Sequence, residues 1–152
     1  MKRLTSLGLL LIAVVIGGCS NGKIATENVT GTVLLDGTPL AGASVNFHPK
    51  TQGQGTPGYA VTNEKGEYIL QTLLGNAQAG TVAGDYTVTV SKKVTEDTKI
   101  AEYGSKEYNT SRGSSQPKET LPAIYIDPKT TPFSATVQKG NNTYDFEVKM
   151  KQ

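Results

Sequence analysis

Residues 29–45 read VTGTVLLDGTPLAGASV, and this stretch has the pattern of two β-strands joined by a turn. Alternate residues of an extended chain point to opposite faces, so Val29, Val33 and Leu35 share one face while threonines occupy much of the other. The Asp-Gly-Thr-Pro sequence at residues 36–39 is a turn signal. Apolar and polar residues alternate again after it, which predicts a second strand.

The same alternation occurs along the rest of the chain. Further segments with apolar alternate positions are residues 59–62, 68–72, 86–90, 133–137 and 144–150. Turn-forming sequences at residues 63–66 and 140–142 precede two of these segments. A strand with one apolar face needs a second sheet to cover it. We therefore expect an all-β fold, a seven-stranded antiparallel Greek-key sandwich with the apolar positions in its core.

Two stretches interrupt this pattern. Residues 73–83 are rich in Gly and Ala and are predicted to form a long hairpin loop. Residues 95–120 are polar, with few aliphatic side chains. Loops longer than about 15 residues are usually functional or disordered, so this second stretch is the long loop of the predicted domain.

Three motifs resemble those of the transthyretin-like module, also called the carboxypeptidase regulatory-like domain. Residues 29–45 match its G-x-V strand, D-G-x-P-L turn and G-A-x-V strand. Residues 62–68 match its T-D-x-x-G-x-Y motif, with Asn63 where Asp is usual, and residues 84–90 match its G-x-Y-x-V-x-V strand. Residues 121–148 resemble the end of short bacterial lipoproteins that carry this module. The resemblance implies a β-sandwich and gives no information on a ligand.

The N-terminal residues resemble a bacterial lipoprotein signal. Lys2 and Arg3 precede an apolar stretch at residues 7–16, which is shorter than the ~20 residues that span a bilayer as a helix. It ends in Ile-Gly-Gly-Cys at residues 16–19, which resembles the lipobox. In that family the cysteine thiol receives a diacylglyceryl group, the chain is cleaved before the cysteine and the new amino terminus is acylated, so Cys19 would carry lipid. The alternative is a membrane-anchored helix with an incidental cysteine.

This resemblance divides the chain into a lipoprotein signal peptide (residues 1–18), a lipidated tether (19–28) and a transthyretin-like sandwich domain (29–152). Cleavage between Gly18 and Cys19 would remove two of the 15 basic residues and leave 13 against 13 acidic ones. A chain without net charge is not attracted to nucleic acid by its overall field, so no nucleic-acid partner is predicted.

The residue after the cysteine bears on location. In the lipobox family Asp at that position commonly retains the protein in the inner membrane, and this chain has Ser20 there. The resemblance therefore favours the outer membrane over the inner membrane of a bacterial cell envelope. Two or more acyl chains, such as palmitate, hold a protein stably on a bilayer, so the membrane itself is the first expected partner.

The sequence offers little for catalysis. A single cysteine cannot form an internal disulfide or a cysteine-based zinc site. The one histidine, His48, lies on a predicted solvent face beside Pro49. Common nucleophile, metalloprotease and phosphate-binding motifs are absent from the sequence. We therefore expect no catalytic residue, no metal ligand and no cofactor.

Three hypotheses for function remain. The first is a lipid-anchored, non-enzymatic module that acts as a structural or interaction protein, with an envelope protein or glycan as partner. The second is a carbohydrate- or peptide-binding lipoprotein that uses residues 95–128, where Tyr103, Tyr108 and Tyr125 are candidate binding residues. Alternation does not assign these rings or that of Tyr59 to the core, although a loop folded over the sandwich would bury them. The third is an accessory domain of an envelope hydrolase.

Overall fold

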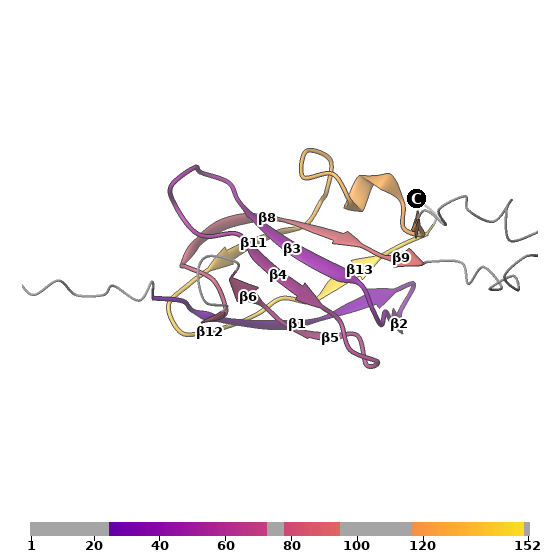
Figure 1. Ribbon diagram of the computed structural model, residues 1–152, viewed down its shortest axis with the longest axis horizontal. Helices are drawn as coiled ribbons and strands as arrows, with labels where there is room; N and C mark the ends of the chain where they lie inside the picture. The colour runs from indigo at the N-terminus through magenta and orange to yellow at the C-terminus, as the bar shows by residue number, and fades with distance from the viewer. Residues whose placement is uncertain (1–24, 73–77, 95–116, 151–152) are drawn as a thin grey trace, which may run out of the picture.

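The computed structural model describes residues 25–72, 78–94 and 117–150, and this part of the chain consists largely of β-strands. Two sheets face each other and enclose the apolar side chains between them (Figure 1). The prediction of an all-β sandwich is confirmed. The helical content of the described residues is one short 3-10 helix, η1 (Ala123–Tyr125).

The strands are short and closely spaced along the chain. Their bounds are β1 (Asn28–Leu35), β2 (Thr38–Pro39), β3 (Ser44–Pro49), β4 (Gly58–Val61), β5 (Glu67–Ile69), β6 (Gln71–Thr72), β7 (Gln78–Ala79), β8 (Gly84–Ser91), β9 (Lys93–Val94), β10 (Lys118–Glu119), β11 (Ser134–Val137), β12 (Asn141–Thr143) and β13 (Phe146–Val148).

Strand β1 is the centre of one sheet, which we call the β1 sheet. It pairs with β12 and β13, and also with β2 and β5. The opposite sheet, which we call the β3 sheet, has the order β11-β8-β3-β4-β6-β7. Strands β9 and β10 form a separate two-stranded ribbon. The expected strands are thus present, and short additional strands extend both sheets.

The structure departs from a wholly antiparallel sandwich at the pairing of the first and last strands. Strand β1 runs parallel to β12 and β13, with Asn28 opposite Asn141 and Val33 opposite Phe146. Residues 140–142 were expected to be a turn, but Asn141 begins β12. Alternation assigns a side chain to one face of a strand and does not reveal the direction of its neighbour.

A glycine allows this parallel pairing. Strands β12 and β13 are separated by Tyr144 and Asp145, which lie opposite Gly31 and Thr32. The N–H of Tyr144 donates to the Thr30 carbonyl at 2.9 Å, and an Asp145 carboxylate oxygen accepts the Thr32 N–H at 2.7 Å. A Cβ on Gly31 would lie 1.8 Å from the carbonyl oxygen of Tyr144. The backbones approach so closely that only glycine fits between them.

The apolar alternate positions predicted from the sequence form the core. Phe47 is central and fully buried, with its ring centroid 5.8 Å from that of Tyr86 and 6.3 Å from that of Phe146. Tilted aromatic pairs at such separations are favourable. The buried apolar residues are Val29, Val33, Leu40, Ala43, Val45, Phe47, Ala60, Tyr68, Leu70, Tyr86, Val88, Val90, Leu121, Tyr125, Ala135, Val137, Phe146 and Val148.

Buried hydroxyl groups join two loops at one end of the sandwich. The Tyr86 hydroxyl donates to the Val82 carbonyl at 2.6 Å and accepts the Thr56 N–H at 3.2 Å. It also lies 3.0 Å from the Thr81 hydroxyl, which donates to the Thr56 carbonyl at 2.6 Å. These contacts satisfy polar groups that water does not reach, and they tie the β3–β4 connection to the residues before β8.

The base of the predicted long loop is a two-stranded ribbon. Strand β9 pairs with β10, and one carboxylate oxygen of Glu119 accepts the N–H groups of Lys92 (2.8 Å) and Leu121 (3.2 Å). The end of the predicted 95–120 loop is therefore ordered as strand β10. Residues 95–116 lie outside the described residues. Part of the other predicted loop, residues 73–83, forms β7, which pairs with β6.

His48 is half-buried rather than on an open solvent face. Its Nε2 atom lies 2.9 Å from the Thr89 hydroxyl on the neighbouring strand β8. The predicted position on the outer face gave no information on how closely this neighbour would cover the ring. Partial burial disfavours the charged imidazolium and lowers the pKa of His48 from its usual 6.5.

We expect His48 to make the protein less stable in mild acid. A folded-state pKa below the unfolded-state value means that the unfolded chain binds more protons, so stability is full above about pH 6.5 and falls as the pH decreases. Urea unfolding of the wild type and His48→Gln at pH 7, 6 and 5 measures this. The free energy of unfolding of His48→Gln is expected to fall less over this range, and equal losses in both proteins would contradict the prediction.

Candidate functional site

Strands β4 and β5 are consecutive in the chain but belong to different sheets. Strand β4 pairs with β3, whereas β5 pairs with β1. After β5 the chain passes through Leu70 into β6, which returns to β4 with Gln71 opposite Tyr59. The two strands are thus held together at the turn and at the β4–β6 pairing, and they separate between these points. We call this opening the β4–β5 split.

The turn end of the split is closed by Asn63. Its side-chain oxygen accepts the N–H groups of Lys65 and Glu67, both at 2.9 Å, and its backbone N–H donates to the Glu67 carbonyl at 2.9 Å. Its amide nitrogen donates to the Glu67 carboxylate at 3.0 Å. Gly66 has a φ of +74°, which favours glycine. The predicted turn at residues 63–66 is confirmed, and an aspartate at position 63 would lack the amide donor to Glu67.

Backbone hydrogen-bonding groups face the split from both sides. The Thr62 N–H donates to the backbone carbonyl of the residue before β3 at 2.9 Å. The Leu70 N–H donates to a backbone carbonyl of β1, also at 2.9 Å. Backbone groups of successive strand residues point to opposite edges, so the N–H and C=O of Val61 and Ile69 point away from β3 and β1. Within the described residues no strand pairing joins these groups across the split.

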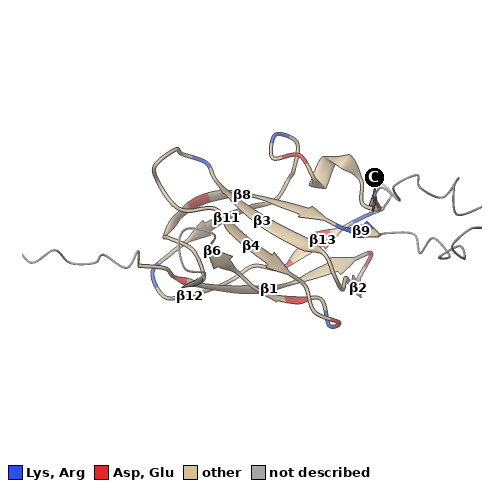
Figure 2. Ribbon diagram, viewed as in Figure 1, with Lys and Arg blue, Asp and Glu red and all other residues tan. Residues whose placement is uncertain are grey.

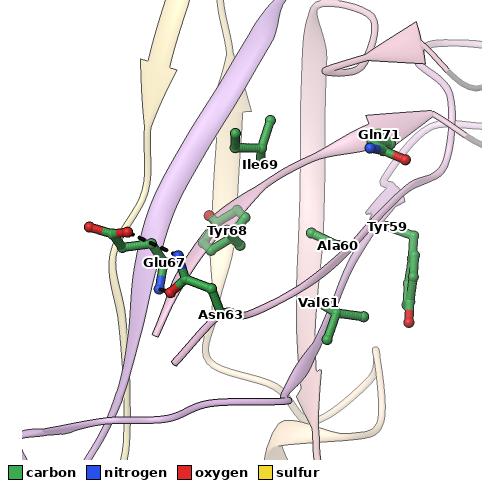
Figure 3. Close-up of a pocket in the computed structure, with 8 residues that line it drawn as sticks. All are labelled: Tyr59, Ala60, Val61, Asn63, Glu67, Tyr68, Ile69 and Gln71. Atoms are coloured by element: carbon green, nitrogen blue, oxygen red, sulfur yellow. Dashed lines mark hydrogen bonds between the residues drawn. The ribbon is translucent and has the colours of Figure 1, made fainter. Parts of the chain in front are cut away.

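A hollow of about 470 Å³ occupies the split. Figure 3 shows Tyr59, Ala60 and Val61 on one side and Tyr68 and Ile69 on the other. Its lining residues are Tyr59, Ala60, Val61, Asn63, Glu67, Tyr68, Ile69 and Gln71. Val61 and Ile69 are 51% and 61% exposed, so two large aliphatic residues face solvent on either side of the split. The site therefore combines apolar rims with free backbone donors and acceptors.

Tyr68 forms a rigid part of the wall. Its hydroxyl donates to the Tyr144 carbonyl at 2.8 Å, and its ring stacks on Phe146 at a centroid distance of 6.4 Å. Burial first, and then the nearby Asp145, raise the pKa of Tyr68 well above its usual 10.0. At physiological pH the phenol therefore remains neutral and keeps its hydrogen bond to the Tyr144 carbonyl. A second hollow, of about 390 Å³, lies along β5 and shares Glu67, Tyr68 and Ile69 with the first.

Glu67 is the one charged side chain among the residues that line the split. The adjacent turn has one negative side chain, Glu64, and one positive side chain, Lys65, whose charges offset each other (Figure 2). In the described residues no group of three or more metal-ligating side chains is close enough to hold a metal ion. The arrangement is suited to hydrogen bonding and apolar packing with a ligand that brings positive charge toward Glu67.

Tyr125 is the one sequence-predicted site residue among the described residues, and it does not line the split. Gly18 and Cys19, the predicted cleavage and lipidation site, lie outside the described residues, as do Tyr103 and Tyr108. The described residues contain no helix long and apolar enough to pass through a bilayer.

The structure places Tyr125, a predicted binding residue, in the core rather than on the surface. This side chain is 3% exposed at the end of η1, and its ring stacks on Phe133 with a centroid distance of 5.2 Å. Its hydroxyl accepts the Lys149 N–H at 3.2 Å. The ring became buried because the chain after β10 folds over the sandwich, as the alternative interpretation of this segment expected.

The sequence analysis missed Val61 and Ile69. A signal was available, because alternation places both residues on the solvent side of strands whose neighbours, Ala60 and Leu70, face the core. Two aliphatic residues at outward positions on either side of one turn indicate a surface with a further role. Tyr59, which alternation left unassigned, also lines this site.

Comparison with known proteins gives little further information. No family model and no curated protein matches the chain. The chain is similar to a solved structure described as a DUF3823 family protein from Parabacteroides merdae, with 11% sequence identity, a TM-score of 0.40, and 83% of this chain and 47% of that chain covered. This chain therefore spans about half the length of that protein.

Proposed function

We propose that the protein is a lipid-anchored, non-enzymatic interaction module of a bacterial cell envelope that binds a partner at the β4–β5 split. The observation that carries the binding role is the split itself, where unpaired backbone groups lie between the exposed side chains of Val61 and Ile69. The described side chains that line it include no imidazole, thiol or amine to act on a bound molecule.

The anchor is inferred from the sequence. The lipobox resemblance of residues 16–19 supports cleavage after Gly18 and acylation of Cys19, with residues 19–28 as a tether. Ser20 supports outer-membrane rather than inner-membrane sorting. The membrane is then the partner of the lipid, and an envelope protein or glycan is the partner of the domain.

The position of the split supports this role. Strand β1 begins at Asn28, the last residue of the proposed tether. The turn that closes the split lies toward the other end of β1, where the Gly66 carbonyl accepts the Val33 N–H at 2.8 Å. Five residues of strand separate these points, which is about 16 Å. In a domain anchored through its N-terminus, the split would therefore lie at the end opposite the membrane attachment (Figure 1).

A finer proposal is that the sandwich is a transthyretin-like, or carboxypeptidase regulatory-like, domain. Its support is the order and spacing of the three sequence motifs. In the structure, the residues at two of these motifs form the predicted turns: Gly37 has a φ of +81° and Gly66 a φ of +74°. In enzymes that carry this module it accompanies a catalytic unit, which agrees with the absence of catalytic motifs in this sequence.

We expect Cys19→Ala to abolish lipid attachment. In the lipobox family the thiol receives its diacylglyceryl group before the chain is cleaved and the new amino terminus is acylated, so the variant should lose all fatty-acid label and leave the detergent phase on phase separation. Intact-mass measurement, metabolic labelling with palmitate and membrane fractionation provide the readouts, with Ser20→Ala as the matched control that retains the label. A wild-type product with an unmodified Cys19 or an uncleaved leader would refute the anchor.

A further inference from the structure

Strands β12 and β13 lie end to end along one side of β1. The Tyr144 N–H donates to the Thr30 carbonyl, and the Asp36 N–H donates to the Val148 carbonyl, both at 2.9 Å. Thr30 and Asp36 are an even number of residues apart, so these two bonds lie on the same side of β1. Strand β5, which borders the split, pairs with the opposite side. The β1 sheet therefore ends at β12 and β13 on the side away from the split.

The backbone groups of three residues face away from β1 at this end of the sheet. Residues that bond to β1 alternate with residues that face outward, so Thr143 and Glu147 direct their N–H and C=O outward. The Tyr144 carbonyl lies against Gly31, so the Asp145 N–H, on the other side of the same planar peptide group, also points away from β1. Among the described residues, β1 is the one strand that pairs with β12 or β13. We call the stretch that begins at Thr143 and finishes at Glu147 the open edge.

The open edge is bounded on both sides along the chain. After it, the Lys149 N–H donates to the Tyr125 hydroxyl at 3.2 Å, so η1 meets the strand there. Before it, the Asn142 side chain bonds to backbone groups of the β11–β12 turn at 2.9 and 2.8 Å. The stretch between these contacts is about 16 Å of extended chain.

An extended segment of another polypeptide can continue a sheet at such an edge, because its backbone supplies the missing donors and acceptors. We propose that a short strand of a partner polypeptide pairs antiparallel with the open edge. Partner residues opposite Thr143, Asp145 and Glu147 exchange N–H and C=O with them. The open edge is separate from the split, so this inference goes beyond the proposed function.

The side chains along the open edge specify the partner strand. Asp145 is exposed at its centre, and the described residues give its carboxylate no ion pair, whereas Glu147 is paired with Lys149 at 3.8 Å. The partner strand therefore carries Lys or Arg opposite Asp145. On the inner face, its side chains lie opposite the half-buried Tyr144 and the buried Phe146, which favours β-branched or other apolar residues there.

The same charges disfavour a second copy of this chain as the partner strand. Antiparallel pairing that covers the whole open edge in both copies places Asp145 of one copy opposite Asp145 of the other. Like charges directly opposite each other destabilise a strand pair. A basic strand from a different polypeptide converts this repulsion into attraction.

The capped heptapeptide Val-Thr-Val-Lys-Val-Thr-Val provides the probe. NMR titration of the full protein, as processed by the cells that make it, is expected to show saturable binding with a dissociation constant of about 1 mM or lower. Amide exchange at Thr143 and Asp145 should slow at least about tenfold at saturation, because both N–H groups acquire acceptors. The same peptide with Glu in place of Lys should bind at least about threefold more weakly.

N-methylation of the peptide separates strand pairing from side-chain contact. Methyl groups on the amides of Lys and both Thr remove the N–H groups that face the open edge, and this peptide should not bind. Methyl groups on the amides of the two Val residues next to Lys lie on the far side of the added strand. This second peptide should bind as the unmodified one does.

Matched variants locate the interaction. Thr143→Pro removes an outward N–H at a strand position where proline is tolerated, and should weaken binding at least about tenfold. Thr143→Val keeps the N–H and should leave binding unchanged. Asp145→Asn keeps an oxygen for the Thr32 N–H, and in this variant the preference for the Lys peptide over the Glu peptide should disappear.

Three results would overturn the proposal. They are equal binding of the two methylated peptides, amide protection confined to β5 instead of the open edge, and self-association through the open edge without peptide binding. The methylated peptides decide the question with the wild type alone, so the test stands even where Thr143→Pro does not fold. None of these results bears on the split, which lies on the other side of β1.

Discussion

Gly31→Ala is expected to destabilise the protein by at least about 3 kcal/mol. The added Cβ would lie 1.8 Å from the Tyr144 carbonyl oxygen and 2.9 Å from the Tyr68 hydroxyl. The first of these atoms belongs to the backbone, so no rotamer change relieves the contact. The segment between β12 and β13 would have to move away from β1, and the hydrogen bond from the Tyr144 N–H to the Thr30 carbonyl would be lost. Urea unfolding monitored by circular dichroism measures this effect.

Gly37→Ala is the matched control for this substitution. Gly37 has a φ of +81°, and a Cβ there would meet no atom within 4 Å. The only cost is the left-handed backbone, about 1 kcal/mol. If Gly31→Ala were no more destabilising than Gly37→Ala, the close approach of β1 and Tyr144 would not exist in the protein in solution.

Tyr86→Phe is expected to lower the free energy of unfolding by about 2 kcal/mol. The substitution keeps the buried ring and removes the hydroxyl, so the Thr56 N–H and the Val82 carbonyl lose their shared partner. Buried groups left without a partner cost more than the hydrogen bond itself contributes. Denaturant titration gives the value, and faster amide exchange at Thr56 would locate the loss.

Two comparisons test this explanation. Tyr59→Phe removes a hydroxyl at the rim of the split, where no hydrogen bond involves it among the described residues, and should change stability by less than about 0.5 kcal/mol. The double variant of Tyr86→Phe and Thr81→Val should lose less than the sum of the two single variants, because the two hydroxyls interact. Additive losses would mean that these hydroxyls act independently.

The strands and core were predictable because alternation reports directly on burial. Val45 and Phe47 alternate with polar neighbours in the sequence, and both are fully buried in the structure. Turn residues were equally informative, since Gly66 adopts a backbone conformation that other residues rarely take. These features depend on local sequence, and a single segment contains the information needed to recognise them.

The other features depend on tertiary structure. The parallel pairing of β1 with β12 and β13 joins segments far apart in the chain, and alternation is the same for either strand direction. The burial of Tyr125 depends on where η1 meets Phe133. The β4–β5 split exists because two consecutive strands join different sheets, and no local pattern distinguishes this from an ordinary hairpin.

The parallel pairing also constrains the order in which the chain can fold. Strand β1 is made before β12 and β13, which cover one of its edges, and Asn28 and Asn141 are 113 positions apart. That edge stays open until β12 and β13 have emerged, and long-range pairings of this kind form slowly. A chain without β12 and β13 would therefore expose an unpaired strand edge on which other chains can aggregate. Protection by chaperones is most important before these two strands have been made.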